Sequence, residues 1–429
     1  MDICIIGSGY VGLTSAVVLA DLGHHVICVD KDQNKINALQ KGEYPIYEPG
    51  LTELMHKNRN RLQFRSDVGQ VIQQTAVILI AVGTPPMSNG KTDLKYIDSV
   101  IDILAQNIKS YKTIITKSTV PPGTNQFMSE MLIKKGVEPS LFNIVSNPEF
   151  LREGSAVHDM LFPDRTVIGI QKDDTKSLEI MHALYKGIQA PFFHTSLDGA
   201  EMIKYTSNAF LATKISFINE IARICDAYHI DITEVAKGVG YDSRINPDFL
   251  QAGLGYGGSC FPKDLHSLIY TANSKQVSVP ILQAVQSINS TQVDLYIEKI
   301  RNHLKDPSSN RLTILGVSFK PNTDDTRDSL AVTLIEKLIP LGYEIHTYDP
   351  IALLPSHVKK QVTQHTELES SITDSDCIII ATEWDEFKTL DWQRVKKLMR
   401  GCKIVDGRNC LERNEVVKNG LHYIGIGRP

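Results

Sequence analysis

The chain has 429 residues, of which 42% are hydrophobic and 22% charged, so it is long enough for two or three soluble domains. Its net charge of −4 comes with no basic block, which argues against nucleic acid as a partner. The N-terminus shows no signal-peptide pattern, and no apolar run reaches the roughly 20 residues of a membrane span. We therefore expect a cytoplasmic enzyme with no membrane partner.

The N-terminal third is typical of a β-α-β arrangement. The short apolar run "ICIIG" is followed by "GLTSAVVLADLG", which has helical character, and by a second strand pattern in "HVICVD". The later runs "AVILIAVGTP" and "TIITKSTVPPG" each end in a loop with proline or glycine, as parallel strands do at their carboxyl ends. The pattern predicts a doubly wound sheet over residues 1–198.

A long helix is predicted next, over residues 199–228. This stretch has no proline and no internal glycine, and its apolar residues recur every three or four positions. Helical character continues to about residue 302, apart from a glycine-rich loop near residue 255. We expect residues 199–302 to form a helical middle domain that bridges two other domains and contributes the core of a dimer.

A second β-α-β pattern begins at Arg311, with "LTILGVSF", "SLAVTLIEKLIPLG" and "EIHTYDP", and continues through "DCIIIATEW" and "CKIVDGRN". It resembles the first domain, and Asp349 ends its second strand as Asp30 does, but its opening turn lacks G-x-G-x-x-G. We therefore predict an α/β fold with two Rossmann-like doubly wound domains, the second over residues 303–429, joined by the long central helix and the helical middle domain. The two domains are expected to bind different nucleotides.

The motif "GSGYVG" is a dinucleotide-binding fingerprint in its proper context. Gly7, Gly9 and Gly12 follow a strand and open a helix, an arrangement that allows a tight turn, backbone approach to a pyrophosphate and close helix–strand packing. Asp30, at the end of the next strand, suits the ribose hydroxyls and would repel a 2′-phosphate. The sequence therefore predicts NAD rather than NADP.

The seven cysteines include no Cys-x-x-Cys pair and no cluster with zinc spacing, so we expect neither a metal site nor a disulfide framework. Cys4, Cys28 and Cys377 stand in apolar strand-like runs and are predicted to be inert core residues. Cys260 differs, because it follows the glycine-rich run "GLGYGGSCFPKD". So many glycines indicate a backbone that must approach another group closely. The loop that they form presents a single thiol.

Seven motifs occur in one order along the chain: "GSGYVG", "KSTVPPGT", "NPEFLREG", "EMIKYTSNAF", "GLGYGGSCFPKD", "VSFKPNTDDTRDS" and "VDGRN". Together they resemble the UDP-glucose 6-dehydrogenase family over essentially the whole chain. This resemblance implies an NAD-binding domain, a helical middle and a UDP-binding domain. It also implies two successive oxidations that take the C6 alcohol of the sugar to a carboxylate while two NAD are reduced.

The resemblance also implies roles for six residues. Cys260 matches the family nucleophile, whose thiol adds to the aldehyde as a thiohemiacetal and then forms a thioester. Lys204 and Asn208, four residues apart on the long helix, match residues that stabilise an oxyanion. Asp264, Thr119 and Glu149 match positions around a water molecule, and the assignment of each proton transfer among Asp264, Glu149 and Lys204 stays open.

Contacts to both ligands are carried over in the same way. The cofactor is expected at Gly7, Gly9, Tyr10, Val11, Gly12, Asp30, Lys35, Thr84, Thr119, Glu153, Lys263 and Arg327. The UDP-sugar is expected at Glu149, Phe150, Leu151, Arg152, Lys204, Asn208, Arg244, Phe249, Leu250, Gln251, Ala252, Gly253, Gly257, Lys320 and Arg408. The basic members suit a diphosphate, because arginine and lysine form charge-assisted hydrogen bonds to its oxygens.

The resemblance further implies a homodimer in which Arg408 reaches the UDP-sugar of the neighbouring subunit. Three alternatives stay open. The same chemistry acts on GDP-mannose or an N-acetylated UDP-hexose in related enzymes. A two-electron hydroxyacid dehydrogenase would use Lys204 and Asn208 but leave Cys260 idle, and a non-catalytic nucleotide-sugar sensor would need no nucleophile at all.

Overall fold

The structure is a computed structural model that describes residues 1–44, 46–304 and 306–429. It divides into two compact units, residues 1–207 with 266–275 and residues 208–265 with 276–429. Helices α9 (Leu197–Tyr228) and α11 (Phe261–Ser274) each contribute residues to both units. Within the described part of the chain, no helix has the length and apolar character to cross a membrane.

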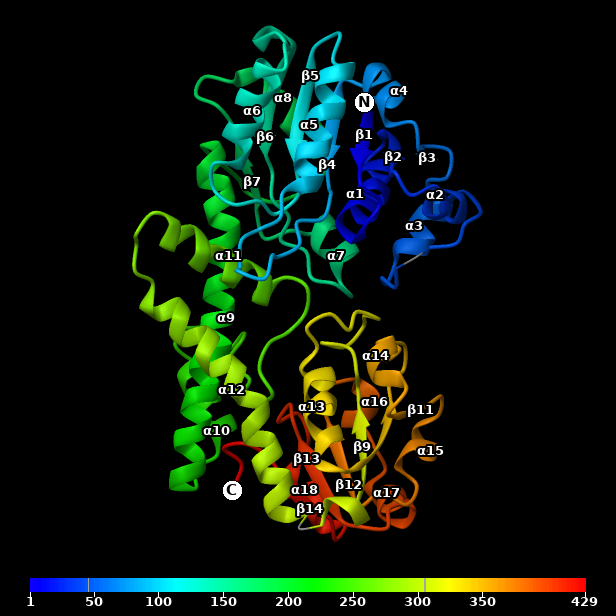
Figure 1. Cartoon of the computed structure of the whole chain (residues 1–429), viewed down its shortest axis with the longest axis vertical. Coiled ribbons are helices and arrows are strands. Elements are labelled where there is room, and N and C mark those ends of the chain that lie inside the picture. Colours follow the sequence, from blue (N-terminus) through cyan, green and yellow to red (C-terminus); the bar gives the residue numbers. More distant parts are fainter. Residues whose placement is uncertain (45, 305) are drawn as a thin grey trace. The chain divides into compact units, whose positions relative to one another are not determined.

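The first unit is built on an eight-stranded sheet (Figure 1, blue to green). All neighbouring strands are parallel except β6 and β7, which join antiparallel through one residue pair, Ser146 and Gly169. The antiparallel join was not part of the sequence prediction. In sheet order the strands are β3 (Leu62–Arg65), β2 (His25–Val29), β1 (Asp2–Ile6), β4 (Val77–Ile80), β5 (Lys112–Thr116), β6 (Phe142–Ser146), β7 (Thr166–Gly169) and β8 (Phe192–Thr195).

Helices cover both faces of this sheet because alternate strand residues point to opposite sides. Ile3 and Ile5 of β1 pack in one apolar cluster and Cys4 and Ile6 in another. The first cluster includes side chains of α1 (Tyr10–Asp21), α2 (Gln33–Gln40), α3 (Leu51–Lys57), α7 (Ala156–Leu161) and α8 (Thr175–Leu184). The second includes α4 (Val68–Gln74), α5 (Lys95–Asn107) and α6 (Thr124–Lys134), and η1 (Pro139–Leu141) precedes β6.

The second unit contains a six-stranded sheet that is parallel throughout (Figure 1, yellow to red). In sheet order its strands are β11 (Thr363–His365), β10 (Glu344–Tyr348), β9 (Arg311–Leu315), β12 (Cys377–Ile380), β13 (Lys403–Asp406) and β14 (His422–Ile424). One face packs against α10 (Ile232–Gly240), α12 (Pro280–His303), α13 (Leu330–Leu338) and α14 (Ser356–Lys359). The other packs against α15 (Leu368–Ile372), α16 (Asp385–Lys388), α17 (Trp392–Leu398) and α18 (Arg413–Lys418), with η2 (Pro307–Ser309) and η3 (Ile339–Leu341) in the connections.

The predicted fold class is confirmed: two Rossmann-like sheets occur with long helices between them in the sequence. The helix predicted over 199–228 begins two residues earlier, at Leu197, and ends at Tyr228 as expected. Cys4, Cys28 and Cys377 are at most 1% exposed, which confirms them as core residues. Burial raises the pKa of the Cys28 thiol to about 12, so this sulfur stays protonated and unreactive.

Candidate active site

The turn between β1 and α1 is shaped for a dinucleotide. Gly7 has a φ of +105°, and a Cβ on Gly12 would lie only 1.9 Å from the carbonyl oxygen of Gly7. A Cβ on Gly9, by contrast, would meet nothing within 4 Å, and no side chain caps the first turn of α1. The uncapped helix N-terminus and the open space at Gly9 fit the pyrophosphate of NAD.

Asp30 lies beside this turn at the carboxyl end of β2. Its Oδ2 accepts hydrogen bonds from the Ser8 amide at 3.0 Å and the Ser8 hydroxyl at 2.7 Å, and Lys35 Nζ lies 3.6 Å away. Burial alone raises the pKa of Asp30, but the hydrogen bonds from Ser8 and Asp32 and the charge of Lys35 outweigh it and lower the pKa. An ionised carboxylate at this position fits the ribose hydroxyls of NAD.

The loops after β4 and β5 are tied together at the same edge of the sheet. The Thr84 hydroxyl donates to the carbonyl oxygen of Thr119 at 2.8 Å, and the Ser118 hydroxyl donates to that of Val82 at 2.8 Å. Thr84 and Thr119, both predicted near the cofactor, are therefore directly joined. Parallel sheets of this kind bind ligands at their carboxyl edge.

Glu149 and Lys204 form a buried ion pair in the first unit. Their side chains are 6% and 4% exposed, and Lys204 Nζ lies 3.0 Å from Glu149 Oε1. The Leu151 amide donates to Glu149 Oε2 at 2.5 Å, and the ring of Phe150 lies 5.4 Å from the Lys204 ammonium. A buried cation and carboxylate in contact can stabilise an oxyanion or move a proton once a substrate is bound.

Three of the predicted residues meet around Asp264 in the second unit, one helical turn from Cys260. Cys260 directly precedes α11, and the Asp264 amide donates to its carbonyl oxygen at 2.9 Å. The fully buried Asp264 carboxylate accepts from Asn208 Nδ2 at 2.6 Å and from Lys263 Nζ at 2.5 Å. The half-buried Cys260 therefore lies one helical turn before a carboxylate that an amide and an ammonium orient.

The glycines before Cys260 are explained by close packing. A Cβ on Gly257 would lie 2.1 Å from the carbonyl oxygen of Asp328. Gly258 has a φ of +81°, and a Cβ there would lie 2.5 Å from the ring of Phe319. The loop can therefore lie directly on the segment that follows β9 only if these positions lack side chains, and Phe319 packs on the loop.

The guanidinium of Arg408 is held inside its own chain. It donates to the carbonyl oxygens of Ala381, Gly255 and Phe319 at 2.7, 3.1 and 3.0 Å, and it pairs with Glu383 at 3.2 Å. These contacts link the β13 loop to the loop before Cys260. They give no support to the expectation that Arg408 reaches into a neighbouring subunit.

Three other predicted arginines form local ion pairs on the surface. Arg152 pairs with Asp159, Arg244 with Asp242 and Arg327 with Asp325, each at 2.6 Å, and these arginine side chains are 63%, 87% and 66% exposed. Their roles toward NAD or the UDP-sugar stay predictions. The same holds for the remaining expected contacts, Tyr10, Val11, Glu153, Phe249, Leu250, Gln251, Ala252 and Lys320.

Two buried glutamates hold the expected cofactor loops and were not predicted. Glu48 accepts from the Tyr10 hydroxyl and from the Gly154 amide, the latter at 2.7 Å. Glu201 accepts from the amides of Gly123 and Asn125 at 2.7 and 2.8 Å, at the start of α6. Glu201 lies three residues before Lys204 on α9, so helical spacing was a usable signal for it, whereas nothing local marked Glu48.

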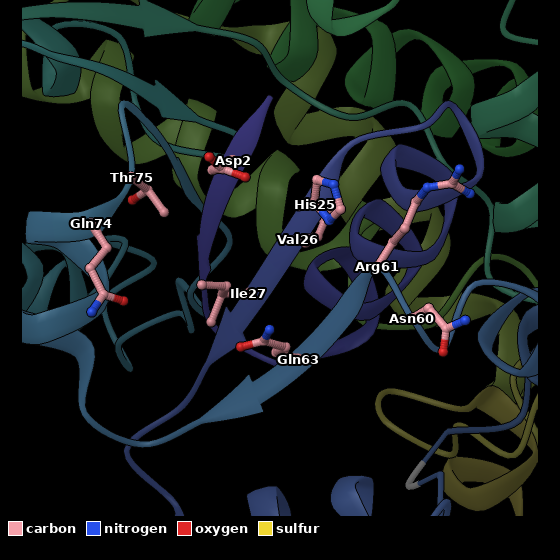
Figure 2. Close-up of a pocket in the computed structure, with 9 residues that line it drawn as sticks. All are labelled: Asp2, His25, Val26, Ile27, Asn60, Arg61, Gln63, Gln74 and Thr75. Carbon is pink, nitrogen blue, oxygen red and sulfur yellow. The ribbon is translucent and has the colours of Figure 1, made fainter.

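A hollow of about 270 Å³ lies at the opposite edge of the first sheet (Figure 2). Its lining comes from the amino ends of β1, β2 and β3 and from the end of α4: Asp2, His25, Val26, Ile27, Asn60, Arg61, Gln63, Gln74 and Thr75. None of these residues is a predicted site residue. The hollow is therefore separate from the fingerprint turn, which follows the carboxyl end of β1.

Comparison with known proteins identifies the family of the chain. Three models of the UDP-glucose/GDP-mannose dehydrogenase family match it: the NAD binding domain over residues 1–189, the central domain over 198–291 and the UDP binding domain over 313–413.

Relatives and solved structures match over the full length. YtcA of Bacillus subtilis, provisionally named a UDP-glucose 6-dehydrogenase, is 52% identical over 429 residues, with both chains fully covered. The UDP-glucose 6-dehydrogenase YwqF of the same organism is 42% identical over 100% of this chain and 98% of its own. A UDP-glucose dehydrogenase structure from Pyrobaculum islandicum superposes with a TM-score of 0.91 at 33% identity, covering 100% of this chain and 98% of that one. The chain is therefore an NAD-dependent enzyme of the UDP-glucose/GDP-mannose dehydrogenase family.

Proposed function

We propose that this enzyme oxidises UDP-glucose to UDP-glucuronate, a four-electron reaction that consumes two NAD. The observation that carries the proposal is the presence of Cys260 in a tightly packed glycine loop. One helical turn later stands Asp264, whose carboxylate accepts hydrogen bonds from Asn208 and Lys263. Full-length relatives at 40–42% identity that are named UDP-glucose 6-dehydrogenase support the choice of sugar. We also propose the domain division 1–198, 199–302 and 303–429.

NAD, bound at the fingerprint turn and Asp30, would accept a hydride from C6 in each oxidation. The first oxidation gives an aldehyde, and the Cys260 sulfur then adds to its carbon while the carbonyl oxygen gains a proton. The resulting thiohemiacetal loses its hydroxyl proton and its C6 hydride to become a thioester. Water then adds to the thioester carbon, the C–S bond breaks, and the products are the carboxylate and the free thiol.

The buried polar residues suit the remaining work of this cycle. Lys204 and Asn208 are proposed to supply a cation and an amide donor to the oxyanion that would develop on C6. Asp264, Glu149 and Thr119 are proposed to orient water and accept protons. Because Glu149 already contacts Lys204 and Asp264 already contacts Asn208, each oxyanion donor comes with a carboxylate that fixes its orientation.

We propose that the enzyme is a homodimer formed along α9. Phe210, Phe217 and Ile224 recur every seventh residue on this helix, so they share one face, and they are 64%, 50% and 51% exposed. Sedimentation of the wild type and of Phe217→Glu tests the assembly, and a monomeric wild type would refute it.

Mixing Arg408→Ala with Cys260→Ala subunits tests whether Arg408 is shared between subunits. Restored activity shows a shared site, and the absence of restored activity agrees with the contacts of Arg408 in its own chain.

The function is tested by the yield of NADH from each nucleotide sugar. We expect two NADH per UDP-glucose and little free aldehyde, with much lower kcat/KM for GDP-mannose and for N-acetylated UDP-hexoses. A preference for one of those sugars would identify the substrate as that of a related enzyme. A yield of one NADH would leave Cys260 idle, and binding of UDP-glucose without turnover would indicate a sensor.

The role of Cys260 is tested with two substitutions. Cys260→Ala should still bind NAD and UDP-glucose, but turnover should fall by several orders of magnitude because the covalent step is lost. Cys260→Ser should accumulate an ester that intact-mass measurement detects, since its alkoxide is a poor leaving group. Cys402→Ser, at another half-buried thiol, is the matched control and should behave as wild type. Near-normal two-to-one turnover by Cys260→Ala would contradict the mechanism.

A further inference from the structure

The loop that leads to Cys260 has no regular secondary structure over residues 251–257, yet peptide groups at positions 253–256 are hydrogen-bonded to side chains and backbone of other segments. At Gly253, the N–H donates to Asn219 Oδ1 at 2.8 Å and the carbonyl oxygen accepts from Gln292 Nε2 at 2.8 Å. Gln292 Nε2 also lies 3.2 Å from Asn219 Oδ1, which locks the two amides together. Both side chains are fully buried, so neither amide is in contact with solvent.

A second amide pairs with the loop at Tyr256. The Tyr256 N–H donates to Asn289 Oδ1 at 2.9 Å, and Asn289 Nδ2 donates to the Tyr256 carbonyl oxygen at 2.9 Å. Asn289 and Gln292 are three residues apart on α12, so they share one face of that helix. A side-chain amide carries a donor and an acceptor as a peptide group does, and it can therefore replace a neighbouring strand.

The peptide groups between these two points are hydrogen-bonded to the loop that follows β13. The Leu254 N–H donates to the carbonyl oxygen of Gly407 at 2.7 Å, and Arg408 Nη1 donates to that of Gly255 at 3.1 Å. Gly255 has a φ of +108°, and a Cβ on it would lie 2.4 Å from Asn289 Oδ1. The loop is therefore hydrogen-bonded to the helix amides and to the β13 loop, and a side chain at Gly255 would displace it.

We infer that Asn219, Asn289 and Gln292, here called the amide clamp, are positioning residues that fix the 253–256 loop and through it the approach of Cys260 to the sugar. The clamp acts through the backbone and need not touch the substrate. The inference rests on the proposed function for the identity of the substrate, but not for the effect on the Cys260 thiol.

Asn289 offers the best test because it is only partly buried. In Asn289→Ala we expect kcat/KM for UDP-glucose to fall by about tenfold to a hundredfold, the effect of a roughly 1 Å misplacement. The KM for NAD should stay within twofold, because the fingerprint turn belongs to the other unit. Iodoacetamide should alkylate Cys260 faster, as followed by peptide mass mapping. Asn289→Asp should lose at least as much, since it turns a carboxylate oxygen toward the Tyr256 carbonyl.

The control is Gln286→Ala, which removes an exposed amide from the same helix and should change none of these values. A fall in melting temperature with kcat/KM and alkylation rate both within twofold of wild type would reduce the clamp to a stabilising contact. If Asn289→Ala does not fold, Gly255→Ala is the second variant, because its Cβ displaces the same loop while the Asn289 side chain is kept. Wild-type kcat/KM and alkylation rate in Gly255→Ala would overturn the inference. A wild type inactive on UDP-glucose would refute the proposed function alone, because the alkylation rates still test the clamp.

Discussion

The two sheets of the molecule have the same strand order in their first six members, yet only one of them carries a dinucleotide turn. β3-β2-β1-β4-β5-β6 in the first unit corresponds to β11-β10-β9-β12-β13-β14 in the second. The second strand of each set is followed by an aspartate, Asp30 in one unit and Asp349 in the other. The surroundings of these two carboxylates differ in the number of hydrogen bonds that the protein itself supplies.

Asp349 is fully engaged by its own chain. Its Oδ2 accepts from the Val317 amide at 2.7 Å and from the Ser318 amide and hydroxyl, both at 3.1 Å. Its Oδ1 accepts from the amides of Ile351 at 3.0 Å and Ala352 at 2.8 Å. With five hydrogen bonds and 7% exposure, this carboxylate has little capacity left for a ribose.

The Asp30 carboxylate can still accept hydrogen bonds from a ligand. Besides the two hydrogen bonds from Ser8, it accepts one from the Asp32 amide at 3.1 Å. Its side chain is 17% exposed, and the neighbouring Gly9 opens onto free space. Equivalent positions in equivalent topologies therefore differ in how many hydrogen bonds the protein itself supplies, and we expect only Asp30 to bind a ribose.

The largest expected effect is on stability, from Asp349→Ala. Removing this side chain leaves four backbone amides without their partner, so we expect the second unit to lose about 3–5 kcal/mol of unfolding free energy. Asp30→Ala, which frees fewer groups in a more exposed turn, should cost about 1 kcal/mol. Urea unfolding followed by hydrogen exchange in each unit measures both. A greater loss from Asp30→Ala would reverse the assignment of the two aspartates.

A second prediction concerns pH and the loop after β5, which corresponds to the loop after β13. Burial raises the pKa of Glu201 to about 7, against hydrogen bonds from Asn125 and Gly123 that favour its ionised form. The folded state thus binds this proton more tightly than the unfolded chain, whose pKa is 4.5. The contribution of Glu201 to stability is full below pH 4.5 and is lost as the pH rises through about 7.

Glu201→Gln isolates this contribution because its amide does not titrate. The unfolding free energy of the wild type minus that of Glu201→Gln should fall by about 2–3 kcal/mol between pH 4.5 and 8, on top of a constant offset from altered hydrogen bonding. Denaturant unfolding across this range provides the measurement. A difference that does not vary with pH would show that the Glu201 pKa is the same in the folded and unfolded chain.

The smallest expected effect is on cofactor choice, from Asp30→Ala. Removing a carboxylate from the ribose position should lower kcat/KM for NAD by about tenfold, the loss of one charge-assisted hydrogen bond, and should improve use of NADP. The ratio of kcat/KM values for the two cofactors measures the change, with Asp32→Ala as a neighbouring acidic control. Equal use of NAD and NADP by the wild type would remove Asp30 from the ribose and weaken the contrast with Asp349.

Much of the fold followed from short-range patterns in the sequence. The short apolar runs in "ICIIG" and "DCIIIATEW", the three- and four-residue spacing of 199–228 and the spacing of Gly7, Gly9 and Gly12 each depend on residues that are close together in the sequence. Such patterns predict element type and the fingerprint turn, because the periodicity of burial is a local property of helices and strands. The order of the motifs supplied the family and the candidate residues of its site.

Only the tertiary structure decided which side chains meet. Asn125 lies 76 residues from Glu201, Gly253 lies 34 from Asn219, and the contacts that Arg408 makes inside its own chain reach Gly255, 153 positions away. No local pattern encodes these pairs, because a buried polar group takes whichever partner the packed elements bring within hydrogen-bond distance. The sequence by itself therefore determined the two sheets and predicted the turn for NAD and the unusual setting of Cys260, whereas folding decided how the loop of Cys260 is held.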